Sequence, residues 1–238
     1  MIPLLMFAAL FVLVFIGIPV AFSLMIIAVI FGFTVFGDLV FLQLYGPLLG
    51  TASNFVLAAI PLFIFMGAVL ERSGIARRLF YALQLWLGGL PGGLALSTIA
   101  MCAIFAAASG VVGAVEIVVG LMAIPPMMKA GYKNDLIAGT ICAGGSLGTI
   151  IPPSVIVVVY ASIAQLSIGQ LFAASIFPGI LMVVFFVGYI LVRSMRHPAD
   201  APPLPTAERA LPLKEKLTIS LTAMLPPLAL IVMVLGSL

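Results

Sequence analysis

The sequence predicts an all-α, polytopic membrane protein. Of its 238 residues, 64% are hydrophobic and only 7% are charged, and the mean hydropathy is +1.39. A soluble domain has about 45–50% apolar and about 25% charged residues. The apolar residues form several runs of about 20, the length that a helix needs to cross the hydrocarbon core of a bilayer. These observations exclude a soluble globular domain.

The basic residues carry information about topology. All ten Lys and Arg residues fall into three clusters, Arg72–Arg78, Lys129–Lys133 and Arg193–Lys216. They form no basic stripe, so we expect no nucleic-acid partner. The positive-inside rule places all three clusters in the cytoplasm, with an even number of crossings between each pair. The N-terminus is then cytoplasmic as well.

The first 90 residues are expected to contain two crossings and one surface helix. Pro3–Phe36 is interrupted by glycine and proline and is interpreted as one kinked span; no charged n-region precedes it, so we expect no cleaved signal peptide. Asp38–Thr51 is predicted to be a polar loop on the opposite side, and Asn54–Leu70 the next crossing. Ala76–Leu90 suits an interfacial helix, with Trp86 as its anchor in the headgroup layer.

A re-entrant hairpin is predicted over residues 92–128. Charge parity requires this segment to enter the membrane and return. Its arms, Leu94–Ala108 and Val111–Met128, are short for full crossings and meet at Ser109 and Gly110. Two thin spans are the alternative, but arms of this length favour the hairpin.

A broken helix is predicted over residues 134–162. Asn134 and Asp135 can cap its beginning. Glycines and prolines between Gly144 and Ser154 then interrupt a pattern that is otherwise helical. In hydrocarbon an unsatisfied backbone group costs several kcal/mol, so a broken helix is tolerated only inside protein or beside a polar cavity.

The remaining residues predict two further helices and one loop. A transmembrane helix is expected within residues 166–192, a cytoplasmic loop over 193–216, and the start of another transmembrane helix over 217–238. The single histidine, His197, is expected to be solvated in this loop. Cys102 and Cys142 lie in apolar stretches without a nearby Cys or His, so we expect both to be buried packing residues.

Enzymatic chemistry is not supported by the sequence. It contains no HExxH, no G-x-S-x-G and no phosphate-binding loop, and its one histidine lies in a polar segment. We therefore predict that the protein is not an enzyme.

The two interruptions, about 40 residues apart, predict a binding site. Unwound backbone carbonyls can replace the hydration shell of a cation, while helix N-termini favour an anion. Glycines allow close approach of the backbone, and Pro152 and Pro153 remove N–H donors. These features suit sodium coupling with an anionic substrate. The alternative is that the glycines and prolines only kink and pack helices.

Glu116 is the one carboxylate well inside an apolar run. A charge at the centre of a span costs about 2.5–3.5 kcal/mol on insertion scales, so an acid at this depth indicates function. It is a candidate ligand for a proton or cation. A hydrogen bond to a neighbouring helix is the alternative.

The chain resembles a known family, the large membrane (M) subunit of tripartite ATP-independent periplasmic (TRAP) transporters. The resemblance runs in order over nearly the whole chain. Its motifs are Gly17-Ile18-Pro19-Val20-Ala21, Ile60-Pro61-Leu62-Phe63, Met66-Gly67, Glu71-Arg72-Ser73-Gly74-Ile75-Ala76, Ala108-Ser109-Gly110, Ile124-Pro125, Gly131-Tyr132, Gly145-Ser146-Leu147-Gly148 and Ile151-Pro152-Pro153-Ser154.

The resemblance implies an elevator-type, sodium-driven (Na⁺) transporter, of which this chain looks like the first inverted repeat. Residues 1–90 would belong to the scaffold and its arm, and 91–165 to the transport region. Carried over by position, the family's sodium ligands are mainly backbone carbonyls of Ser109, Gly110, Gly148, Ile151 and Pro153.

Two further residues, Glu116 and Ser154, are candidates for substrate binding or coupling. The family often has further serines after the Ser-Gly pair, whereas Val111-Val112-Gly113 follow here. This departure weakens the expectation that side chains contribute to binding at the tip.

The implied partners are a small membrane subunit, a periplasmic substrate-binding protein and the lipid bilayer of the bacterial inner membrane. The implied activity is import of small organic anions such as carboxylates or keto acids, and we expect the chain to be incomplete alone. The alternatives are a sodium- or proton-coupled dicarboxylate carrier that needs no binding protein, and a membrane fragment that does not transport.

Overall fold

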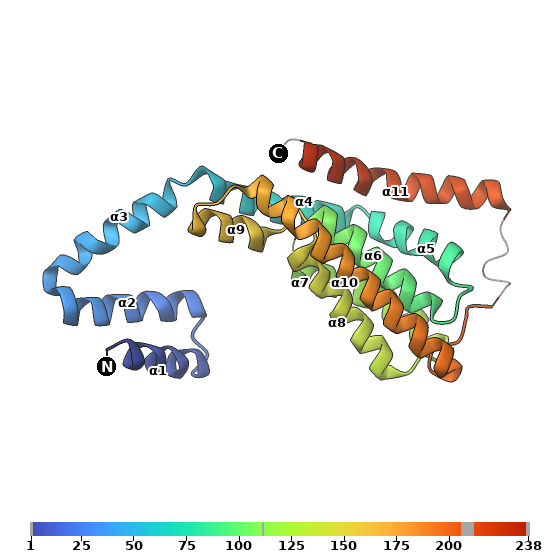
Figure 1. Cartoon of the computed structure of the whole chain (residues 1–238), viewed down its shortest axis with the longest axis horizontal. Helices are drawn as coiled ribbons and strands as arrows, with labels where there is room; N and C mark the ends of the chain where they lie inside the picture. The colour runs from blue at the N-terminus through green and yellow to red at the C-terminus, as the bar shows by residue number, and fades with distance from the viewer. Residues whose placement is uncertain (1, 111, 206–211, 237–238) are drawn as a thin grey trace. The chain divides into compact units, whose positions relative to one another are not determined.

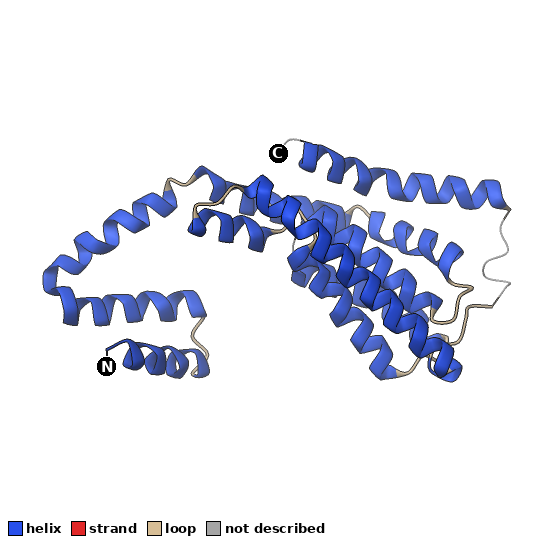
Figure 2. Cartoon of the chain, in the orientation of Figure 1, coloured by secondary structure: helices blue, strands red, loops and turns tan. Residues whose placement is uncertain are grey.

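The computed structural model describes residues 2–110, 112–205 and 212–236, and these residues form helices and loops without a strand (Figures 1 and 2). The chain divides into two compact units, Met1–Phe55 and Val56–Leu238. The α-helices are α1 Ile2–Phe15, α2 Val20–Phe36, α3 Val40–Ala52, α4 Ala59–Arg72, α5 Ile75–Leu87, α6 Gly93–Ser109, α7 Val112–Lys129, α8 Asn134–Ile150, α9 Val155–Ala164, α10 Ile168–Arg196 and α11 Leu213–Gly236.

The first unit corrects the prediction of one kinked span over Pro3–Phe36. The chain reverses between α1 and α2, which lie side by side (Figure 1). Gly17 has φ +98°, a conformation that glycine adopts without strain, and Pro19 has no N–H to continue the first helix. A glycine followed two residues later by proline therefore reverses the direction of the chain here.

The predicted polar loop over Asp38–Thr51 is also wrong. Val40–Ala52 form α3, with Pro47 inside the helix, and only the turn Gly37–Leu39 separates it from α2. Helix formation satisfies the backbone of this segment internally, as an apolar medium requires. The scattered polar residues suggested a loop, but the apolar residues between them were the better guide to the helix.

Helix α6 is the centre of the second unit. Of its 17 residues, 14 are buried, because α5, α7, α8, α10 and α11 pack around it. A helix that is hydrophobic on all sides belongs in a core. Its serine and threonine hydroxyls are accommodated within the helix: Ser97 donates to the Gly93 carbonyl at 2.8 Å and Thr98 to the Leu94 carbonyl at 2.8 Å.

Helices α4 and α5 meet at a bend of 62°. Gly74, in the left-handed conformation with φ +72°, makes this turn. The interfacial interpretation required acyl chains to cover the apolar face of α5. In the structure this face packs against α6 and α11 instead. Trp86 is half exposed and donates its indole N–H to Ser220 Oγ at 2.7 Å.

Four helical stretches in the described part of the chain are long and apolar enough to cross a membrane, or five if the α4–α5 pair counts as one bent span. They are Val20–Ala52, Asn134–Ala164, Ile168–Arg196 and Leu213–Met233. The fold is therefore that of an all-α, polytopic membrane protein, as predicted. Cys102 is buried in α6, but Cys142 is exposed on α8, contrary to expectation.

The predicted loop over residues 193–216 is partly helical, and the segment after α10 is hydrogen-bonded to the rest of the second unit. Helix α10 continues to Arg196, residues 206–211 lie outside the described residues, and α11 begins at Leu213. The connecting segment is held by backbone hydrogen bonds from Lys133 N–H to the Asp200 carbonyl at 3.0 Å and from Gly92 N–H to the Ala201 carbonyl at 3.1 Å. These bonds join the segment that follows α10 to the start of α8 and to the start of α6. His197 is exposed, as expected.

Candidate functional site: the hairpin tip and the helix break

The α6–α7 hairpin turns at Gly110. Its φ of +65° is left-handed, and its N–H closes α6 by donating to the Ala106 carbonyl at 2.9 Å. Helix α7 begins at Val112, so the turn is short. Gly110 allows the chain to reverse directly after Ser109, as a helix C-cap in this conformation does.

The α8–α9 break is shorter than the sequence suggested. Helix α8 runs without interruption through Gly144, Gly145 and Gly148 to Ile150, so these glycines do not break it. The break is confined to residues 151–154. Asn134 and Asp135 are not caps either: the N-cap position is Lys133, and no side chain caps the helix.

Two prolines leave carbonyl oxygens of α8 without their usual donors. In a continuous helix the N–H groups at positions 152 and 153 would donate to the carbonyls of Gly148 and Thr149, but proline has no N–H. The Thr149 carbonyl instead accepts a hydrogen bond from Ser154 Oγ at 2.9 Å. Because residue 152 is proline, the Gly148 carbonyl oxygen lacks its usual helical donor, which makes it a candidate ligand.

The tip of the hairpin touches the break. Val155 N–H, the first of α9, donates to the Gly110 carbonyl at 3.2 Å. A Cβ at Gly110 would lie only 2.5 Å from the Pro153 carbonyl oxygen, so only glycine permits this approach. Residues about 40 positions apart in the sequence are therefore in contact.

Ser109 is fully buried beside this contact, and its Oγ has no hydrogen-bond partner among the described residues. Most buried hydroxyls have a partner, and leaving one without costs about 1–3 kcal/mol. Gly67 of α4 covers the same point: a Cβ there would lie 3.4 Å from Ser109 Cβ. The role of Gly67 was not predicted, although it lies in one of the family motifs.

Ile151 and Ser154 occupy the two ends of the break. The Ile151 side chain packs against Gly179 of α10, where an added Cβ would be 3.1 Å from Ile151 Cγ1. Ser154 is buried, and its hydroxyl is engaged with Thr149. The structure thus brings Ser109, Gly110 and Pro153 together, while the side chains of Ile151 and Ser154 have other contacts.

Glu116 lies on α7 against α8. It is half-buried, and an added Cβ at Gly145 would collide with its Cγ. Within the described part of the chain, the carboxylate has no hydrogen-bond or ion-pair partner. The hydrogen bond to a neighbouring helix that we considered is therefore not present among these residues.

The available ligands are oxygen atoms. Among the described residues, no three His, Cys, Asp or Glu side chains form a cluster that could hold a metal ion. Around Gly110 the candidate donors are backbone carbonyls and one hydroxyl. Such donors suit a hard cation better than a transition metal, which favours nitrogen and sulfur ligands.

Comparison with known proteins identifies the family. The family profile described as "Tripartite ATP-independent periplasmic transporter, DctM component" matches residues 7–238. The chain belongs to this family. The resemblance seen in the sequence is thereby confirmed.

Three DctM relatives illustrate the range of the family. The C4-dicarboxylate TRAP transporter large permease protein DctM of Pseudomonas aeruginosa is 40% identical over 63% of this chain and 35% of its own length. The ectoine/5-hydroxyectoine large permease protein UehC of Ruegeria pomeroyi is 33% identical over 89% of this chain and 50% of its own. The isethionate permease protein DctMQ of Oleidesulfovibrio alaskensis is 42% identical over 57% of this chain and 21% of its own.

The chain spans half or less of the length of these relatives. Family membership thus assigns residues 7–238 to the DctM component of TRAP transporters.

Proposed function

We propose that this chain forms part of a sodium-coupled TRAP transporter that imports small organic anions. Family membership over residues 7–238 supports the class of transporter. The pairing of a hairpin tip with a helix break supports ion coupling, because discontinuous helices near the middle of a membrane form substrate and ion sites in secondary transporters. Residues 91–165 would then move as the transport region of an elevator.

The observation that carries sodium binding is the hydroxyl of Ser109. It is buried without a partner, on the residue directly before Gly110, whose backbone approaches the Pro153 carbonyl oxygen. A bound cation would satisfy this hydroxyl oxygen and the Gly148 carbonyl that Pro152 leaves without a donor. The residues present therefore fit a sodium ion, and Ser109, Gly110, Gly148 and Pro153 would hold it.

An anionic substrate is supported by the helix that follows. The first turn of α9 begins at Val155, directly after the break, and the N-terminus of a helix carries partial positive charge. Relatives carry the names of C4-dicarboxylate and isethionate transporters. We propose carboxylates, keto acids or similar anions as substrates, and Glu116 as a residue that couples ion and substrate binding.

We propose two partners for this chain, a small membrane subunit and a periplasmic binding protein. We propose that the assembly lies in the bacterial inner membrane. These assignments depend on family membership and not on a contact within the chain.

The sodium site is tested by thermal unfolding of the purified chain in detergent, in NaCl and in KCl of equal concentration. At a sodium concentration 100 times the Kd, binding stabilises the folded state by about 2.7 kcal/mol. We expect Ser109→Ala to abolish this difference between the two salts. In KCl the variant should be as stable as the wild type or more so, since it removes a buried hydroxyl that lacks a partner.

Ser97→Ala is the matched control. Ser97 is equally buried on the same helix, but its hydroxyl is satisfied by the Gly93 carbonyl. This variant should keep the sodium effect. Equal stabilisation by sodium in wild type and Ser109→Ala would refute the proposed site.

A further inference from the structure

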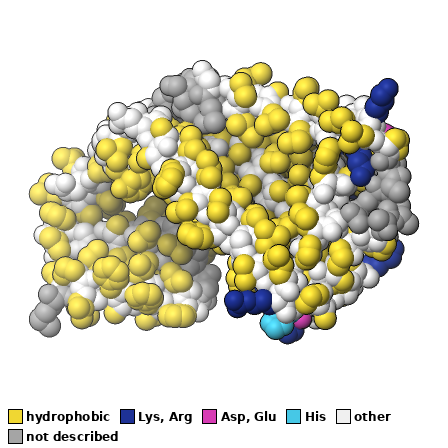
Figure 3. Space-filling model, turned by 45° about the vertical axis from the view of Figure 1, so that its right-hand side comes forward, with side chains coloured by type: hydrophobic (Ala, Val, Ile, Leu, Met, Phe, Trp, Pro, Cys, Tyr) yellow, Lys and Arg dark blue, Asp and Glu magenta, His cyan; other side chains and the backbone are white. Residues whose placement is uncertain are grey.

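A cationic cavity lies at the end of the second unit where α8 begins and α10 ends. Its volume is about 460 Å³, and it is lined by Lys133, Tyr189, Val192, Arg193, Arg196, His197 and Asp200. Figure 3 shows basic side chains, the single histidine and an acidic side chain gathered at this edge. None of these residues belongs to the tip or to the break.

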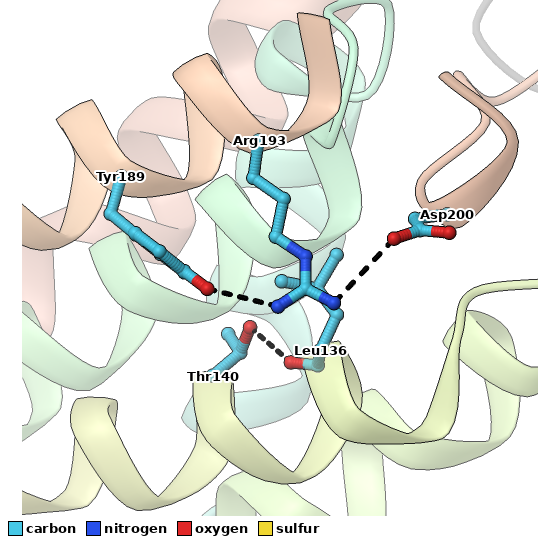
Figure 4. Close-up of polar contacts among 5 residues, drawn as sticks. All are labelled: Leu136, Thr140, Tyr189, Arg193 and Asp200. Carbon is cyan, nitrogen blue, oxygen red and sulfur yellow. Dashed lines mark hydrogen bonds and ion pairs between the residues drawn. The ribbon is translucent and has the colours of Figure 1, made fainter. Parts of the chain in front are cut away.

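Arg193, which lines this cavity, is held in position by two partners (Figure 4). One guanidinium nitrogen donates to Tyr189 Oη at 2.9 Å, and the other lies 3.5 Å from Asp200 Oδ2. Two fixed partners orient the planar group, which suits it to bind an oxyanion. The Arg193–Asp200 pair is only partly exposed, with 23% of each side chain accessible.

The cavity is strongly unbalanced in charge. Three permanent cations, those of Lys133, Arg193 and Arg196, face one carboxylate, that of Asp200, which already pairs with Arg193. Neither Lys133 nor Arg196 has a side-chain partner among the described residues. Two cations are therefore free to bind an anion.

An apolar groove continues from the cavity along α8 and α10. It has a volume of about 290 Å³ and shares Tyr189 and Arg193 with the cavity. The other residues that line it are Ile99, Asp135, Leu136, Gly139, Thr140, Ala143, Phe186 and Ile190. Thr140 donates its hydroxyl to the Leu136 carbonyl at 2.6 Å, so it presents little polarity to the groove (Figure 4).

We propose that this cavity and groove bind one anionic phospholipid, with the phosphate between Lys133, Arg193 and Arg196 and an acyl chain along α8 and α10. The depth agrees with this assignment: Arg193 ends the apolar run of a candidate membrane span, where headgroups meet acyl chains. Basic pockets between transmembrane helices on the cytoplasmic side are typical sites for anionic headgroups.

The apolar groove favours a lipid over free phosphate. An inorganic phosphate would fill the cavity but would gain nothing from Gly139, Ala143 or Phe186. A lipid uses both parts, because its acyl chain covers these apolar side chains. The two sources can be separated by changing the groove without changing the charge.

The test measures lipid binding to the full chain in a neutral detergent, by native mass spectrometry and by the shift in unfolding temperature. The ligands are phosphatidylglycerol, phosphatidylcholine and inorganic phosphate. We expect phosphatidylglycerol to bind selectively and to raise the unfolding temperature. The double variant K133Q/R196Q should bind it about 30-fold more weakly, at about 1 kcal/mol for each basic side chain.

R77Q/R78Q is the matched control. It removes the same charge from the exposed face of α5, away from the cavity, and should leave lipid binding unchanged. R196Q alone changes an exposed side chain and serves if the double variant does not fold. Equal affinity of wild type and R196Q, or equal affinity for the two lipids, would overturn the proposal.

Gly139→Phe tests the groove. Gly139 lines the groove, and nothing lies within 4 Å of a Cβ at this position, so the new side chain starts without a clash and its ring would occupy part of the groove. It should weaken binding of phosphatidylglycerol and leave the response to inorganic phosphate unchanged. If inorganic phosphate stabilises wild type as much as phosphatidylglycerol does, the cavity is a phosphate site and the lipid assignment is wrong.

Discussion

At the scale of single residues, the glycines of α8 have different functions. A Cβ at Gly144 would collide with Cys102 Sγ and would lie 3.0 Å from Cys102 Cβ, whereas a Cβ at Gly139 meets no atom within 4 Å. Cys102 is fully buried and has a short side chain, so it cannot move aside. Gly144 therefore sets the distance between α6 and α8, much as small residues do at membrane helix interfaces.

We expect Gly144→Ala to lower the free energy of unfolding by about 1–3 kcal/mol through overpacking. Gly139→Ala is the control on the same helix and should raise it by about 0.5–1 kcal/mol, because alanine favours the helix more than glycine does. Chemical unfolding in detergent measures both. Similar effects of the two substitutions would contradict the packing role of Gly144.

Tyr132 illustrates how one side chain can hold a helix end. It lies in the loop between α7 and α8 with its side chain buried, and its hydroxyl oxygen accepts the Leu94 N–H, near the start of α6, at 3.2 Å. The first N–H groups of a helix have no partner within it, so this contact satisfies one of them. Burial raises the pKa of Tyr132 to about 12, although the hydrogen bond from Leu94 lowers it.

This shift predicts a dependence of stability on pH. An unfolded tyrosine has a pKa of about 10, so between pH 10 and 12 the folded state retains a proton that the unfolded state loses. The stabilisation is complete below pH 10 and is lost as the pH rises toward 12. We expect Tyr132→Phe to remove this part of the pH dependence and to cost about 1–3 kcal/mol at neutral pH, since it leaves the Leu94 N–H unsatisfied.

Tyr81→Phe is the control, since Tyr81 is exposed on α5 and the substitution breaks no hydrogen bond that holds α6. Unfolding curves at pH 8, 10 and 11.5 compare the variants. A Tyr132→Phe protein that loses stability above pH 10 as steeply as the wild type would show that other groups cause the effect.

At the scale of elements, the break depends on the missing N–H groups of two adjacent prolines. Pro152→Ala restores a donor at the position that would pair with the Gly148 carbonyl and so lengthens α8. We expect the variant to fold and to lose its response to sodium in the unfolding experiment. Pro178 lies inside α10, and Pro178→Ala should preserve that response. A sodium effect of normal size in Pro152→Ala would exclude Gly148 as a ligand.

The sequence predicted the positions of turns and breaks where glycine or proline causes them. It did not predict the form of each one, and it did not separate these glycines from glycines that serve packing. The turn at Gly110 and the break at Pro152 and Pro153 lie where the sequence indicated. The reversal at Gly17 was interpreted as a kink, because a kinked span and a tight reversal require the same residues. Gly144 and Gly145 were interpreted as part of the break, although they serve packing.

At the scale of the whole molecule, the loops at one end of the second unit are joined. The bond from Lys133 N–H to the Asp200 carbonyl connects the second and third basic clusters. They must therefore lie on the same side of the membrane. The first cluster, at the start of α5, is assigned to that side by charge parity alone.

Cysteine labelling from each side of the membrane tests both statements. Cys142 is exposed and should first be replaced by serine, while Cys102 is buried and can remain. Cysteines introduced at Lys129 and His197, both exposed, should react from the same side. Reaction of an Arg77→Cys variant from the opposite side would refute the predicted hairpin topology. It would not contradict the placement of the second and third basic clusters on one side.

Composition and the positions of glycine and proline determined, without a structure, that this is a helical membrane protein with a turn at Ser109–Gly110 and a break before Ser154, and its motifs resembled the TRAP family to which the family profile assigns it. These properties depend on the local backbone and on the energy of burial in lipid, which the residue types decide. Only the tertiary structure showed that the turn contacts the break, that Ser109 is buried without a partner, and that Lys133, Arg193 and Arg196 meet around one cavity. Such contacts depend on the packing of helices that are far apart in the sequence, and no local pattern encodes the distance between them.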